Sequence, residues 1–199
     1  MSVDVVDLVF ALQGDAVALD YADRLWRAIE ARIPWLADEP LAGVHPLAGV
    51  SAGDHELYLT RRARLTLRLP TSCVDRARTL SGAHLDLGGV VEVGAATQLA
   101  LSPIKTLYSS FVTIGHTAEE EFLGACQAKL AASGIPAQLV CGKAHVGRGL
   151  GGDWRGFSLM LFGLTMEDSL RLQREGLGGE RKRGCGIFIP HKSVAAVSE

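Results

Sequence analysis

Two successive stretches of the chain repeat one order of strands and helices, and this repeat limits the possible folds more than any other feature. In the first stretch, apolar periodicity predicts five elements in order: strand 3–12, helix 20–36, one strand or a strand pair at 56–69, a short helix from residue 70 to about residue 81, and one or two strands at 84–93. The first half therefore has the order β-α-β-β-α-β.

The second half gives the same order of elements. They are strand 107–115, helix 118–133, strand 137–146, strand 154–163, a helix from Thr165 to about Glu175, and strand 185–190. Two βαββαβ units, residues 1–95 and 96–199, thus account for all 199 residues. We expect an α+β fold of two tandem ferredoxin-like (RRM-like) units, related in architecture because few side chains match between the halves.

Composition excludes several classes of protein. Hydrophobic residues make up 48% of the chain, which is enough for a folded core. No apolar run approaches the roughly 18 residues of a membrane-spanning helix, and acids stand where a secretory signal would carry lysines. The cysteines and histidines are scattered and lack the spacing of paired metal ligands, so we expect no metal site and no other cofactor. The scattered cysteines also fit no disulfide framework, which favours a reducing compartment. We expect a cytoplasmic protein with no membrane partner.

A row of arginines alternates with leucines near the middle of the first half. Within residues 61–69, one face of the predicted strand carries leucines, and the other carries arginines. RNA-binding domains of this topology use such a charged face, so we expect these residues to contact phosphates: Arg61, Arg62, Arg64 and Arg68. The alternative is a solvated sheet surface without a ligand.

A glycine-rich basic segment, GLGGERKRGCG at residues 176–186, precedes the last predicted strand. Glycines allow a ligand to approach the backbone closely, and basic side chains supply charge for phosphate oxygens. The residues concerned are Gly176, Gly178, Gly179, Arg181, Lys182, Arg183, Gly184 and Gly186. A P-loop is excluded because no GK[ST] follows and a strand comes next. The alternative is a flexible solvated hairpin loop.

Two further features are weaker signals. GRGLGG at residues 147–152 matches GxGxxG, but a strand follows it, so we interpret it as a β-turn in which Arg148 contacts a phosphate. His45 lies in a loop between Gly43 and Gly49. Without other information, a lone loop histidine is most often unremarkable.

Three segments together carry a resemblance to a known family. They are WLADEP at residues 35–40, GVHPLAG at 43–49, and the terminal GLGGERKRGCGIFIPHK. Over essentially the full chain, the sequence resembles the RAMP superfamily of CRISPR-associated proteins. Within that superfamily, it is most similar to the endoribonucleases that cut precursor CRISPR RNA at its repeats, in their compact myxococcal-subtype branch.

This resemblance implies a metal-independent reaction. In such enzymes a 2′-hydroxyl attacks the adjacent phosphate in line, giving a 2′,3′-cyclic phosphate or a 3′-phosphate and a 5′-hydroxyl. The implied partners are the repeat hairpin of precursor CRISPR RNA, the mature guide RNA whose 3′ stem stays bound, and other subunits of an RNA-guided interference complex. The glycine-rich basic segment is expected to contact RNA and pack against the repeat stem.

The resemblance also implies catalytic residues. A histidine in or just after the first helix usually acts as general base or acid, and His45 occupies that position. An imidazole suits this task because its reference pKa is about 6.5. Tyr21 is the candidate for a second acid or for stabilising the phosphorane, and His55 is the reserve candidate should His45 be structural.

Two alternative functions remain open from the sequence. One is a non-catalytic RAMP subunit that only binds or caps guide RNA. The other is a duplicated ferredoxin-like protein that binds a small molecule. The second alternative predicts no RNA affinity and gives the clustered arginines no purpose.

Overall fold

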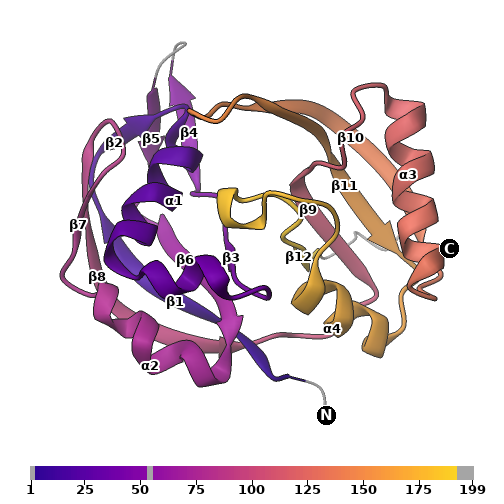
Figure 1. Cartoon of the computed structure of the whole chain (residues 1–199), viewed down its shortest axis with the longest axis horizontal. Coiled ribbons are helices and arrows are strands. Elements are labelled where there is room, and N and C mark those ends of the chain that lie inside the picture. The colour runs from indigo at the N-terminus through magenta and orange to yellow at the C-terminus, as the bar shows by residue number, and fades with distance from the viewer. Residues whose placement is uncertain (1–2, 53–55, 192–199) are drawn as a thin grey trace, which may run out of the picture. The chain divides into compact units, whose positions relative to one another are not determined.

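The chain forms two compact units, as seen in a computed structural model that describes residues 3–52 and 56–191 (Figure 1). Of the described residues, the first unit contains 3–52, 56–101, 146–154 and 180–185. The second contains 102–145, 155–179 and 186–191. These boundaries differ from a simple division after residue 95, because residues 146–154 and 180–185 pack within the first unit.

The first unit is built on a five-stranded antiparallel sheet with the order β3-β6-β1-β8-β7. Its strands are β1 (Val5–Gln13), β3 (Gly43–Val44), β6 (Arg64–Pro70), β7 (His84–Asp86) and β8 (Val90–Ala100). Its helices are α1 (Tyr21–Arg32) and α2 (Val74–Ala77), with short 3-10 turns at Pro34–Asp38, Thr71–Cys73, Arg78–Leu80 and η4 (Arg181–Arg183).

The second unit has a four-stranded sheet with the order β10-β11-β9-β12. Its elements are β9 (Thr106–Val112), α3 (Glu119–Ala132), β10 (Gln138–Gly147), β11 (Trp154–Phe162), α4 (Met166–Glu175) and β12 (Ile189–Pro190). The four main strands, numbered 1 to 4 along the chain, are β1, β3, β6 and β8 in the first unit and β9, β10, β11 and β12 in the second. With this numbering both sheets have the strand order 2-3-1-4. This common order confirms the two ferredoxin-like units.

Several local details differ from the sequence-based predictions. Residues 16–18, 49–52 and 56–59 form a separate three-stranded sheet, β2 (Ala16–Ala18), β5 (Glu56–Leu59) and β4 (Gly49–Ala52), where only one of these strands was expected. The first helix ends at Arg32, and Pro34 begins a 3-10 turn because proline has no N–H to continue the α-helical ladder. The last strand is shorter than predicted and contains only Ile189 and Pro190.

One face of the sheet in the first unit is covered by the hydrophobic core, which leaves the opposite face for polar side chains. Leu25 and Ile29, one turn apart on α1, are buried together with Leu8 and Phe10 of β1. On β6 the leucines 65, 67 and 69 join the same cluster. Because side chains alternate along a strand, Asp7 of β1 lies on the face opposite to this core.

None of the helices in the described ranges has the length and apolar character needed to cross a membrane.

Candidate active site

A buried ion pair occupies the sheet face opposite to α1. Asp7 and Arg68 are direct cross-strand partners on β1 and β6. The guanidinium of Arg68 donates from Nε to Oδ1 and from Nη2 to Oδ2 of Asp7, both at 2.8 Å. Arg68 is only 1% exposed. The expectation that Arg68 contacts RNA phosphates is therefore wrong: its charge is neutralised inside the protein by a carboxylate that the arginine pattern did not reveal.

His45 contacts the same carboxylate. It follows β3, the edge strand beside β6, and its backbone N–H donates to the carbonyl of Thr66 at 2.9 Å. Its ring Nε2 lies 3.2 Å from Oδ1 of Asp7, the oxygen that also accepts from Arg68 Nε. The His45 side chain is 14% exposed, so part of it still reaches the surface. Asp7, Arg68 and His45 form what we call the His45 cluster.

The charges in this cluster determine the state of the imidazole. Burial would raise the pKa of Asp7, but hydrogen bonds from Arg68 and His45 outweigh it and hold that pKa well below its usual range. Burial is also the main reason why the pKa of His45 lies below its ordinary value of 6.5; Asp7 opposes this shift. An ionised Asp7 can only accept hydrogen bonds, so the Nε2 of His45 carries the proton. The neutral ring therefore has its lone pair on Nδ1.

Tyr21 fixes the loop that carries His45. Its hydroxyl accepts a hydrogen bond from the backbone N–H of Leu47, at 2.9 Å. Burial raises the pKa of Tyr21 to about 12, so the phenol keeps its proton throughout the neutral range. The structure thus gives Tyr21 a contact that positions residues 45–47; its role as an acid stays a prediction.

The turn η4 packs against both β3 and α1, and the contacts of Lys182 and Arg183 hold it there. Lys182 donates from Nζ to the carbonyl of Ala37 and lies 5.5 Å from the centre of the Trp26 ring. Arg183 donates to Asp23 at 2.7 Å and to Glu180 at 2.6 Å. These contacts anchor the turn to the first unit.

Arg181 and Gly184 bring the same turn close to His45. The positive charge of Arg181 is the smallest of the influences that lower the pKa of His45, after burial and the charge of Arg68. Gly184 has a φ of 87°, and a Cβ there would lie 3.3 Å from Cγ of Pro46. A side chain at 184 would thus be strained and would push on the residue that follows His45.

Comparisons with known proteins now decide the family. The protein family described as Cas6 Crispr matches this chain over residues 6–193. The chain belongs to the Cas6 family. It is 38% identical over 194 residues to the CRISPR-associated endonuclease Cas6 of Myxococcus xanthus (strain DK1622), covering 96% of this chain and 84% of that protein. The resemblance inferred from residues 35–40, 43–49 and the terminal glycine-rich segment is confirmed.

Solved structures agree on the fold of this Cas6 chain. One, titled as a RAMP protein binding different RNA substrates, has a TM-score of 0.71 at 12% identity and covers 92% of this chain and 98% of its own. Another, described as the product of a Cas6-related gene from Pyrococcus furiosus, has a TM-score of 0.68 at 12% identity and covers 92% and 97%. At such identities the likeness concerns the fold.

The remaining predicted RNA-binding residues are placed as follows. Arg61, Arg62 and Arg64 are exposed at the start of β6 or in the turn before it, and Arg64 also donates to the carbonyl of Ala63 at 2.7 Å. Arg148 is exposed in the turn before β11. The glycines that belong to the second unit are Gly176, Gly178, Gly179 and Gly186. His55 lies outside the described residues.

Sequence reasoning missed Asp7 as a functional residue. A signal was present, because an acid inside an otherwise apolar strand of the first sheet needs a partner. Asp23 was missed for the same reason: it is buried in α1 and accepts hydrogen bonds from Arg183 and from the Leu150 backbone. Within residues 3–52 and 56–191, no three His, Cys, Asp or Glu side chains are grouped as metal ligands.

Proposed function

We propose that this Cas6 protein is a repeat-processing endoribonuclease that cleaves precursor CRISPR RNA, with His45 as the general base. The observation that carries the proposal is the His45 cluster, in which an ionised Asp7 holds a neutral imidazole. Its family membership and its 38% identity to a Cas6 endonuclease support the same activity.

The reaction needs one proton removed from a 2′-hydroxyl. The Nδ1 of His45 takes that proton, and the 2′-oxygen forms a bond to the adjacent phosphorus. The bond between phosphorus and the 5′-oxygen breaks, and the leaving oxygen takes a proton from solvent. The products are one RNA with a 2′,3′-cyclic phosphate and one with a 5′-hydroxyl. Asp7 stabilises the imidazolium that forms, and Arg68 keeps Asp7 in place.

Positive charge near the reaction centre stabilises the phosphorane. Arg181 supplies it from η4, while Lys182 and Arg183 hold that turn through their own contacts. Exposed arginines and the glycine-rich segment bind phosphates of the repeat stem; these arginines are Arg61, Arg62 and Arg64. The protein acts in the cytoplasm, stays on the 3′ stem of the mature guide and joins other subunits of an interference complex.

A cleavage assay in EDTA tests this function. RNA copied from the CRISPR repeat of the same locus is expected to be cut once, giving the two end groups named above. The same RNA with a single 2′-deoxy substitution at the scissile nucleotide is expected to bind but remain uncut, because the attacking oxygen is missing. Cleavage of the 2′-deoxy RNA, or a strict need for a divalent ion, would overturn the mechanism. Tight binding of the normal RNA without any cut would instead identify a guide-binding subunit.

A further inference from the structure

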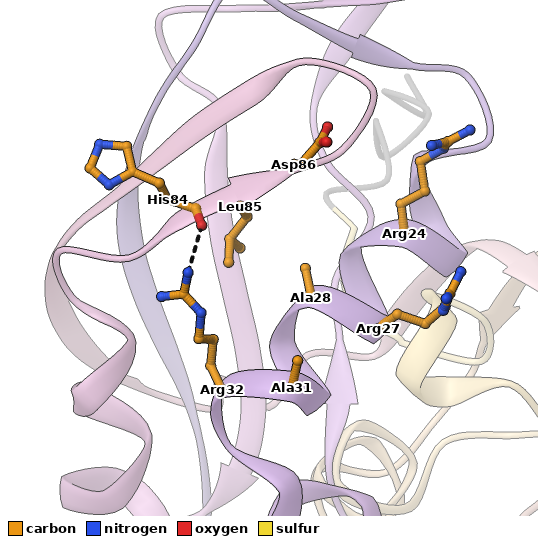
Figure 2. Close-up of a pocket in the computed structure, with 8 residues that line it drawn as sticks. All are labelled: Arg24, Arg27, Ala28, Ala31, Arg32, His84, Leu85 and Asp86. Atoms are coloured by element: carbon orange, nitrogen blue, oxygen red, sulfur yellow. Dashed lines mark hydrogen bonds between the residues drawn. The ribbon is translucent and has the colours of Figure 1, made fainter.

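A cavity of about 420 Å³ lies between α1 and β7 of the first unit, and Figure 2 shows the residues that line it. Three exposed arginines of α1 line the cavity: Arg24, Arg27 and Arg32. Small and apolar side chains from both elements also line it, namely Ala28, Ala31 and Leu85, together with His84 and Asp86 of β7. None of the lining residues belongs to the His45 cluster, so this cavity is separate from the proposed reaction centre.

A second cavity of about 230 Å³ continues the first across the surface of α1. Arg24 and Arg27 line both cavities and form their common wall. On its far side the second cavity is lined by Arg148 and by its neighbours Gly149 and Leu150, in the turn where GxGxxG was noted. Four arginines therefore follow one continuous path, which we call the arginine track: Arg32, Arg27, Arg24 and Arg148.

Carboxylates line both cavities beside the arginines of the track. Asp86 is the carboxylate of the first cavity, and Arg24 forms an exposed pair with Asp20 at 3.1 Å. Such an exposed pair contributes little stability, so breaking it to bind a phosphate costs little. In the second cavity Asp153 is exposed and Asp23 is bound to Arg183. Arg32 donates to the carbonyl of His84 at 3.1 Å, which fixes its position (Figure 2).

We propose that the arginine track binds the backbone of a single-stranded RNA segment that flanks the repeat stem. This inference rests on the proposed function, which supplies RNA as the ligand. The first cavity has the size of a small-molecule pocket and admits a single unstacked nucleotide rather than a double helix. Two cavities in series with a shared arginine wall match a strand of several nucleotides better than one free nucleotide. His84 supplies the aromatic ring among the residues that line the two cavities, and arginines predominate, so recognition depends mainly on the backbone.

The test compares two RNAs, each blocked against cleavage by a 2′-deoxy scissile nucleotide. One is the repeat stem alone, and the other carries a single-stranded extension of about eight nucleotides, within the usual span of such sites. By fluorescence anisotropy, the double variant Arg27→Ala with Arg148→Ala is expected to bind the extended RNA roughly tenfold more weakly than wild type. The slope of log K against log salt concentration should become less steep by about 1.4, because each lost phosphate contact to a single strand accounts for about 0.7. Affinity for the stem alone should not change.

A matched control removes two exposed cations of the second unit, Lys129→Ala with Lys143→Ala, and is expected to bind both RNAs like wild type. Unchanged affinity of the track variant for the extended RNA would overturn the inference, as would equal weakening for both RNAs. Displacement of the extension by micromolar AMP would also overturn it, because it would show a site for a free nucleotide. If wild type binds neither RNA, the proposed function fails, and the two failures are thus distinguishable.

Discussion

Replacing His45 by alanine is expected to lower the rate of repeat cleavage by about 10²–10⁴-fold, which is the range for loss of a general base. RNA affinity should remain within about threefold of wild type, since a neutral imidazole adds no charge for phosphates. The effect is large because Nδ1 of His45 is the proton acceptor that Asp7 holds in position.

Single-turnover cleavage and anisotropy, measured on the same preparations, separate these two effects. His116→Ala is the matched control, because His116 is an exposed histidine of the second unit, paired to Glu121 at 3.4 Å. It should cleave like wild type. If His45→Ala cleaved within threefold of wild type while His116→Ala did the same, His45 would be structural, and His55 would become the candidate base.

Replacing Arg68 by methionine is expected to destabilise the protein by about 3–5 kcal/mol. The substitution removes the buried guanidinium of Arg68 and leaves the carboxylate of Asp7, which is only 18% exposed, without the partner that neutralises it. Urea unfolding measures the loss. Because Arg68 also keeps Asp7 against His45, the folded fraction of the variant should cleave more slowly than wild type.

A double variant keeps this prediction falsifiable. Asp7→Asn combined with Arg68→Met removes both charges, so much of the lost stability should return, while cleavage should stay impaired because the carboxylate is gone. Arg62→Met is the matched stability control, since Arg62 is exposed, and it should change the free energy of unfolding by about 0.5 kcal/mol or less. A loss below about 1 kcal/mol for Arg68→Met would show that the pair is not needed for the fold.

Much of the fold could be predicted from the order of apolar segments, because two- and 3.6-residue periods identify strands and helices directly. The alternation on β6 gave the correct buried face, with its leucines in the core. The alternation could not predict that Arg68 is buried, because the opposite face of a strand is exposed only if no other part of the protein covers it. The partner, Asp7, lies 61 residues earlier, and only the register of β1 against β6 brings the two together.

The short strands were missed for a related reason. β2 and β3 contain three and two residues, too few to show any period. The basic segment at 181–183 was recognised by composition, but its side-chain contacts depend on α1 and on the turn after Pro34, far away in the sequence. His45 itself was found through resemblance, while its hydrogen bond to Asp7 became visible only in the structure.

The pH dependence of cleavage tests the central claim most directly, namely that His45 reacts as a neutral base. Because burial lowers the pKa of His45 below 6.5, kcat/KM should rise with pH as the ring loses its proton, with the midpoint of the rise below pH 6.5, and then level off. The rising limb should disappear in His45→Ala. A wild-type kcat/KM that falls as pH rises from 5 to 7, or that rises with a midpoint above pH 6.5, would contradict the account.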